Sequence, residues 1–144
     1  MSGQDSGKIT IIDAKGLVLG RMASVIAKRL LNGEKIIVVN AEGAVISGDK
    51  YRIIQQYHDY LQIGHPGRGP LHPRRPDRIV KRAIRGMLPY KQPRGREALK
   101  RLRVYMSVPE DLKGKPMETI PEADASRLRG PRITVSELSK YIIG

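Results

Sequence analysis

The sequence predicts an α/β fold with a parallel sheet, and three observations support this prediction. Two stretches, residues 8–14 and 35–41, are β-branched and almost continuously apolar, which is typical of strands buried on both faces. Between them, from Leu19 to Leu31, apolar residues recur at steps of three or four, as in an amphipathic helix. All ten prolines lie at Pro66 or later, so the earlier part of the chain is free to form regular structure.

The first three elements therefore form a βαβ unit. Lys15 and Gly16 supply a turn after the first strand, and Asn32 with Gly33 supplies a stop after the helix. The second strand follows directly, and we expect it to pair in parallel with the first through a right-handed crossover.

A short strand and a second helix are expected next. The strand covers residues 44–46, and Ser47 can cap the helix that follows. The helix places Ile53, Ile54, Tyr57 and Leu61 on its apolar face and should end before Gly64.

Residues 64–76 then form a basic loop, because prolines, glycines and arginines dominate them. Pro76 suits the first turn of a third helix, in which Asp77 lies favourably near the positive end of the helix dipole. This helix has two faces: Ile79, Val80, Ala83, Ile84, Met87 and Leu88 on the apolar side, and Arg78, Lys81, Arg82 and Arg85 on the other.

The remaining elements are short. After a second basic loop, residues 95–102 predict a helix and residues 103–108 predict a strand. The last third of the chain is a mixed-charge extension. It ends in a helix for which Thr134 and Glu137 have capping-box spacing.

Positive charge is concentrated in the middle of the chain. The formal net charge is +13, and residues 64–103 hold 13 basic and only 2 acidic side chains. A solubilising surface normally mixes both signs, whereas one-signed charge this dense favours a polyanionic partner. Nucleic acid is the favoured partner, with solvated charge or an anionic membrane surface as the alternatives.

Several classes of protein are excluded. The chain has no cysteine, which excludes a disulfide scaffold, a thiolate zinc site and a cysteine nucleophile. No apolar run approaches the ~20 residues that span a bilayer, and the polar N-terminus does not resemble a secretory signal, so a cytoplasmic protein is expected. His58, His65 and His72 are evenly spaced, but Pro66 and Pro73 break any helix that could align them on a metal.

No catalytic constellation is evident. Residues 43–50 lack the lysine position of a phosphate-binding loop, where Asp49 stands instead. The turn from Gly16 to Arg21 has the wrong spacing for dinucleotide binding, so Gly16 and Gly20 are interpreted as glycines of a tight turn and of the helix entry. Trp and Phe are absent, which favours contact with backbone and shape over base stacking; Tyr90 is the one candidate for stacking, with core packing as an equal alternative.

Residues 68–105 carry a specific resemblance. The RGMLP stretch at 85–89 and the residues after it closely resemble the central signature of the universal large-subunit ribosomal protein 13 family. Residues 19–43 and 46–61 agree with the same family, so the resemblance covers roughly 9–108. The RGPLHPRRP loop and the absence of the bacterial HPH pattern resemble the archaeal and eukaryotic branch, and we favour an archaeal type.

The resemblance implies a three-layer α/β/α domain with a small, mainly parallel sheet of about four strands. That domain covers residues 1–108, includes the basic segment 64–103, and is followed by the extension 109–144. The resemblance further implies a cytoplasmic constituent of the large ribosomal subunit that binds large-subunit ribosomal RNA, meets neighbouring ribosomal proteins and supports assembly. It implies no enzymatic activity, and we expect no cofactor, metal, membrane or small-molecule substrate.

The residues expected to face RNA combine the family signature with the basic loop and the basic face of the third helix. Within this set, Met87 and Leu88 are expected to anchor the helix, Gly86 to permit close approach, and Arg85, Lys91, Arg94 and Arg96 to meet phosphates. The predicted RNA-binding residues are Arg68, Arg74, Arg75, Arg78, Lys81, Arg82, Arg85, Gly86, Lys91, Arg94, Gly95, Arg96, Lys100 and Arg101.

Two other functions remain open. An RNA-modifying enzyme, such as a methyltransferase, could hold its substrate on the same basic face but would need a nucleoside-cofactor pocket, for which only the turn at 16–21 is a candidate. A DNA-compacting protein would share the charge and would bind random duplex equally well.

Overall fold

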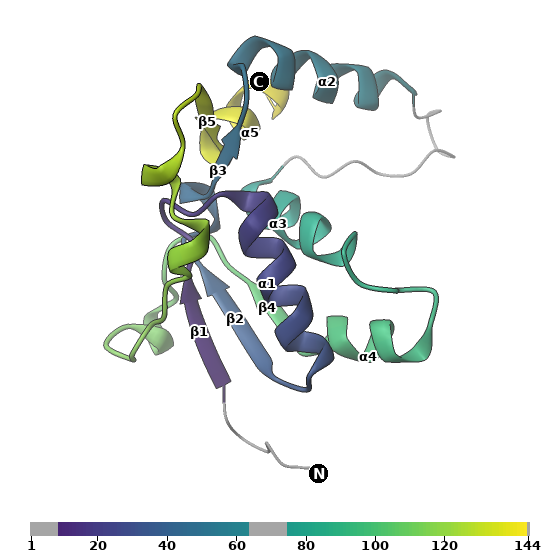
Figure 1. Ribbon diagram of the computed structural model, residues 1–144, viewed down its shortest axis with the longest axis vertical. Coiled ribbons are helices and arrows are strands. Elements are labelled where there is room, and N and C mark those ends of the chain that lie inside the picture. Colours follow the sequence, from purple (N-terminus) through teal and green to yellow (C-terminus); the bar gives the residue numbers. More distant parts are fainter. Residues whose placement is uncertain (1–8, 64–74, 144) are drawn as a thin grey trace.

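The computed structural model describes residues 9–63 and 75–143 and confirms the α/β class (Figure 1). No helix in these two ranges is long and apolar enough to cross a membrane. The helices and strands are β1 (Ile9–Asp13), α1 (Leu19–Leu31), β2 (Lys35–Val39), β3 (Val45–Ser47), α2 (Lys50–Ile63), α3 (Pro76–Arg85), α4 (Pro93–Lys100), β4 (Leu102–Val104), β5 (Arg132–Thr134) and α5 (Val135–Ile143).

The main sheet is parallel and has the strand order β1-β2-β4. Its register pairs Ile11 with Ile37 and Ile36 with Leu102, so the apolar strand β2 lies in the centre. At the outer edge of β1, Glu118 donates its N–H to the carbonyl of Ile11 and accepts from the N–H of Asp13. A single residue of the extension thus bridges to this edge, and the main sheet has three strands where about four were expected.

Helices α1, α3 and α4 cover the same face of this sheet (Figure 1). The chain moves across the sheet in one direction, from β1 to β2 to β4, and right-handed crossovers in one direction place their helices on one face. Met22, Ile26 and Ile84 from the helices pack with Ile12 and Val38 from the strands in the main core.

The opposite face of the sheet is covered by part of the extension and not by the helical layer that was expected. Ile11 and Val39 are buried there against Leu112, which belongs to a 3-10 turn at Glu110–Leu112. Because both crossovers place their helices on the first face, the extension supplies the second layer.

The extension also completes a second, antiparallel sheet. The expected strand at 44–46 lies one residue later, as β3, and pairs with β5. No local pattern in the sequence indicates that β5 is a strand or that it pairs with β3. Helix α5 follows directly, and its Val135 and Leu138 are fully buried in the main core. Residues 110–143 therefore pack onto the body at several places, while the division at residue 108 stays a prediction.

Two helix caps test the sequence interpretation. The capping box of α5 is confirmed, because the N–H of Glu137 donates to Thr134 Oγ1 at 3.0 Å. The Glu137 carboxylate accepts in return from the Thr134 N–H at 3.4 Å. Helix α2, however, is capped by Asp49, whose carboxylate accepts from the Arg52 N–H at 3.1 Å, and Ser47 belongs to β3 instead.

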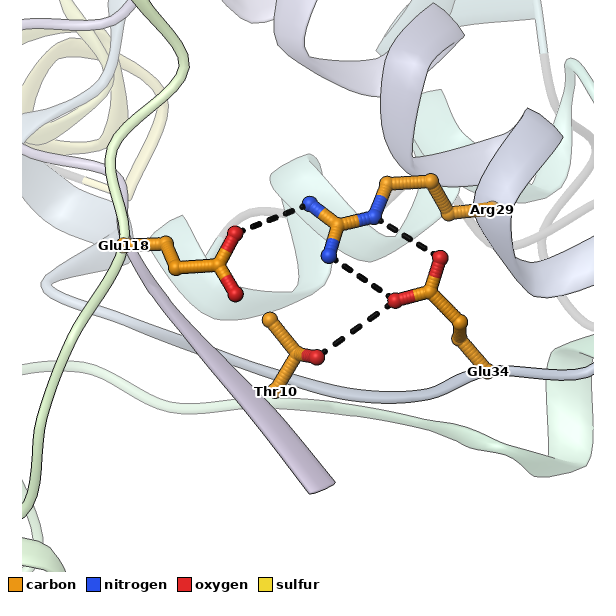
Figure 2. Close-up of polar contacts among 4 residues, drawn as sticks. All are labelled: Thr10, Arg29, Glu34 and Glu118. Atoms are coloured by element: carbon orange, nitrogen blue, oxygen red, sulfur yellow. Dashed lines mark hydrogen bonds and ion pairs between the residues drawn. The ribbon is translucent and has the colours of Figure 1, made fainter. Parts of the chain in front are cut away.

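Three arginines, which we call the anchoring arginines, donate to acceptors of the chain at 2.8 Å or less: Arg29, Arg101 and Arg132. Figure 2 shows Arg29, whose guanidinium donates twice to Glu34, at 2.8 and 3.0 Å, and once to Glu118 at 3.3 Å. The hydrogen bond to Glu34 is the main cause that raises the pKa of Arg29 above its ordinary value. Thr10 Oγ1 donates to the same Glu34 carboxylate at 3.4 Å, so Arg29 and Glu34 together link β1, the end of α1 and the extension.

Candidate nucleic-acid interface

Helix α3 separates apolar from basic side chains as its sequence pattern predicts. Ile79, Val80 and Ile84 are buried against the core. The four cations of the opposite stripe are exposed: Arg78, Lys81, Arg82 and Arg85. Pro76 stands in the first turn, and Asp77 follows it near the positive end of the helix dipole.

The chain turns sharply after α3. The N–H groups of Met87 and Leu88 donate to the carbonyls of Ile84 and Arg85. Leu88 is 4% exposed and anchors this turn, as expected, but Met87 is 45% exposed, so the expectation that it anchors the helix is wrong. The helix ends at Arg85, and the changed backbone direction carries the Met87 side chain outward.

Helix α4 begins at Pro93, two residues earlier than predicted, because Pro93 fits the first turn of a helix. Gly95 on this helix is buried against the turn that precedes it. A Cβ atom on Gly95 would overlap the Pro89 carbonyl and lie 2.9 Å from the Tyr90 nitrogen. Gly95 therefore lets α4 pack onto residues 89–90. The close packing inside the protein explains why a glycine stands at this position.

Gly86 differs from Gly95. It is exposed, has ordinary right-handed backbone angles, and a Cβ there would meet only ordinary contacts, 3.5 Å from the Arg82 carbonyl. Internal packing does not require glycine at this position, and the close approach of a partner at Gly86 stays a prediction.

Two cations of α4 hold the turn in place. Arg96 Nη1 donates to the carbonyl oxygens of Tyr90, at 3.3 Å, and Lys91, at 3.0 Å. Arg94 Nε donates to Gln92 Oε1 at 3.1 Å. Both side chains remain exposed and keep further N–H donors for a partner.

The carboxylates near this region are paired with cations at its margins. Asp77 lies 3.4 Å from Arg75 Nε, and Glu97 lies 3.2 Å from Lys100 Nζ. The other exposed cations of α3, α4 and the turn between them have no carboxylate partner among residues 9–63 and 75–143. We call these the α3–α4 surface: Arg78, Lys81, Arg82, Arg85, Lys91, Arg94 and Arg96.

Tyr90 lies within this surface and is exposed, which answers the question of core packing. The residue is 42% exposed, and the guanidinium carbon of Arg85 lies over its ring, 4.8 Å from the centroid. The sequence singled out Tyr90 but contained no signal for its pairing with Arg85, five residues earlier across the turn.

Of the predicted contact residues, Arg101 is used within the body, and two others are not described by the structure. Arg68 and Arg74 lie outside the described residues. Arg101 is half-buried, and its Nη2 donates to the Leu30 carbonyl at the end of α1, at 2.6 Å. One side of the Arg101 guanidinium is thus already used within the body.

The turn considered for a nucleoside cofactor is occupied by the chain itself. Gly16 has a positive φ of 76°, and its N–H donates to the Gly43 carbonyl. Its carbonyl accepts from Ala125, while the Val18 N–H donates to Ala123. These contacts support the interpretation of Gly16 as a turn residue, and Gly20 lies at the beginning of α1, as expected for a glycine at the helix entry.

Comparisons with known proteins agree with the resemblance found in the sequence. The family model described as ribosomal protein L13 matches residues 7–111. The large ribosomal subunit protein uL13 of Archaeoglobus fulgidus is 51% identical over 135 residues, covering 92% of this chain and 86% of the relative. The protein of the same name from Methanopyrus kandleri is 49% identical, covering 96% and 89%. That from Saccharolobus solfataricus is 45% identical, covering 99% and 97%.

Proposed function

The chain belongs to the ribosomal protein L13 family, and from this premise we propose that it binds large-subunit ribosomal RNA through the α3–α4 surface. Its role is that of a cytoplasmic, structural constituent of the large ribosomal subunit, where it supports assembly beside neighbouring ribosomal proteins. It acts without catalysis of its own.

The observation that carries this proposal is the uncompensated charge of the α3–α4 surface. Its cations come from two helices and one turn that are fixed by buried residues and backbone hydrogen bonds. Because this backbone is already ordered, binding to phosphates requires no further ordering of the main chain, and release of counterions drives the association. Such contacts position a protein on folded RNA without selecting a sequence.

An RNA-modifying enzyme remains the alternative. It requires a cofactor pocket at residues 16–21, where the backbone groups of Gly16 and Val18 are bonded to residues 43 and 123–125. Titration with S-adenosylmethionine is the test: saturable binding in the micromolar range would favour the enzyme over the structural role.

The proposal is tested by removing three cations of α3 in the variant R78Q/K81Q/R82Q. The control, R127Q/R129Q/K140Q, removes the same charge from exposed positions of the extension. Binding to a transcript of the large-subunit ribosomal RNA from the same genome is measured at several salt concentrations. If about six cations contact phosphates, log K falls with log salt at a slope of roughly −4 to −5.

We expect the α3 variant to flatten this slope by about 2 to 3 units, because three phosphate contacts are lost. The control should keep the slope of the unmodified protein. An α3 variant with an unchanged slope, or two variants with equal losses, would refute the assignment of RNA binding to the α3–α4 surface. Incorporation into large-subunit particles should follow the same order.

A further inference from the structure

We propose that the Tyr90 ring is a preformed platform on which one unpaired nucleobase of the RNA stacks. This inference rests on the proposed function and adds a second kind of contact to an interface otherwise made of cations. It also names the class of ligand at this point of the surface: a single-stranded or bulged nucleotide, because bases in a duplex have no free face.

The backbone of Tyr90 is fixed from both sides. Its N–H donates to the Leu88 carbonyl at 2.8 Å, and its own carbonyl accepts from Arg96 Nη1 at 3.3 Å. Gly95 packs directly against the Pro89–Tyr90 peptide. An aromatic side chain on such a rigid turn loses little freedom when a ligand binds.

The ring itself is oriented by a cation. The guanidinium carbon of Arg85 lies 4.8 Å from the ring centroid, while 42% of the residue is still exposed. Aromatic rings this exposed gain little from burial in their own protein, whereas base stacking on a tyrosine is favourable for every type of base. The adjacent Arg85 and Lys91 can hold the phosphates that flank the stacked base.

A second exposed tyrosine shows what is particular to this position. Tyr141 on α5 is 46% exposed, and Lys50 Nζ lies 5.0 Å from its ring centroid. That lysine, however, is paired with the Glu137 carboxylate at 3.7 Å, and a carboxylate repels phosphate. Tyr90 has a similar exposure, but the Arg85 guanidinium over its ring has no carboxylate partner within residues 9–63 and 75–143.

Three variants test the inference on the full chain: Y90L, Y90F and the matched control Y141L. Each is titrated with the transcript of the large-subunit ribosomal RNA used above, after circular dichroism has shown that its fold is intact. We expect Y90L to bind about 5- to 150-fold more weakly, from the range known for loss of one aromatic–base stack. Y90F and Y141L should bind within about twofold of the unmodified protein, because Phe keeps the ring and Tyr141 lies elsewhere.

The salt dependence separates this inference from the proposed function. Y90L removes no charge, so its slope of log K against log salt should equal that of the unmodified protein. If the unmodified chain fails to bind the transcript, the proposed function fails. If it binds and Y90L binds equally well, the stacking platform alone is wrong.

Two further outcomes also decide the matter. Equal weakening of Y90F and Y90L would assign the effect to the phenol hydroxyl and overturn stacking. Ultraviolet cross-linking of the unmodified complex, followed by mass spectrometry and mapping of the RNA, should join Tyr90 to an unpaired nucleotide. A Tyr90 cross-link confined to base-paired nucleotides would contradict the inference.

Discussion

Arginines serve opposite purposes in two regions of the molecule. In the body, the anchoring arginines donate to carbonyls and carboxylates of the chain; Arg101, for example, donates to the Leu30 carbonyl. On the α3–α4 surface, Arg78 and Arg82 are exposed and have no acidic partner in the part of the chain that the structure describes. Arginine is therefore a structural link in the body, whereas on helix α3 it is an exposed cation; Arg96 on helix α4 combines the two, because it is exposed and also donates to two backbone carbonyls.

This comparison shows that counting charges overstates the cations available to a partner. The middle segment is rich in basic residues, but Arg101 and Arg103 bind backbone carbonyls, and Arg75 and Lys100 lie beside carboxylates. What distinguishes the α3–α4 surface is that a helix with a buried apolar face presents its other face to solvent. The position of an arginine relative to the core, more than its position in the sequence, determines its use.

The largest expected effect concerns packing beneath the surface. Gly95→Ala places a methyl group onto the Pro89 carbonyl, and we expect the free energy of unfolding to fall by about 1–3 kcal/mol. Gly86→Ala is the control and should change it by less than about 0.5 kcal/mol, because the added Cβ meets only ordinary contacts. Urea denaturation of both variants measures the difference. Equal stability of the two variants would mean that α4 is not held against the turn as described.

Arg101→Met tests the body directly. The variant loses a hydrogen bond from a charged donor to Leu30, but it also removes the buried Arg101 Nε, which has no hydrogen-bond partner within the described residues. These effects partly cancel, and we expect a net loss of about 1 kcal/mol in unfolding free energy. Arg78→Met should leave stability unchanged and weaken RNA binding instead. If Arg101→Met flattens the salt slope of RNA binding, Arg101 belongs with the contact residues after all.

The contact between Arg29 and Glu118 should contribute less. Both side chains are partly exposed, and their closest atoms are 3.3 Å apart. A double-mutant cycle with Arg29→Met and Glu118→Gln should give a coupling energy of about 0.2–1 kcal/mol. A coupling energy of zero would show that backbone pairing alone holds Glu118 at the edge of β1.

The smallest effect is a dependence of stability on pH. The Asp124 carboxylate accepts from the Ser126 N–H at 2.8 Å, which is the main cause that lowers its pKa below the ordinary value. Since the folded-state pKa is lowered, the stabilisation is present above the unfolded pKa of about 3.9 and is lost as pH falls through the folded value. Asp124→Asn should remove this component from the pH profile of thermal unfolding below about pH 4. A profile that is unchanged by the substitution would contradict the role of the carboxylate in holding the turn that Arg132 also binds.

Local patterns predicted much of the fold. Helix α1 has the predicted bounds, because its periodicity and its terminal Asn32 and Gly33 are local features. The two faces of α3 and the capping box of α5 follow from spacing within a few residues in the same way. The predicted strand at 103–108 is shorter in the structure, as β4, because Ser107 takes a positive φ of 54° and turns the chain away.

Non-local contacts escaped prediction. The pairing of β3 with β5 and the bridge of Glu118 to β1 join residues far apart in sequence, and neither leaves a periodic signal. For the candidate interface, spacing predicted which cations of α3 would be exposed, but it could not show that Arg101 donates to Leu30 or that Arg85 lies over Tyr90. These contacts depend on where the ends of separate helices meet.

The pairing of β3 with β5 has a consequence for biosynthesis. Val45 lies opposite Thr134, and Ile133, Val135 and Leu138 fill the core only once those last segments exist. A nascent chain that still lacks them has a βαβ half with an unfilled interior and an unpaired strand, and long-range closures of this kind fold slowly. The second sheet and this part of the core can therefore form only after residues 132–138 have been synthesised, so the last steps of folding come at the end of translation or after it.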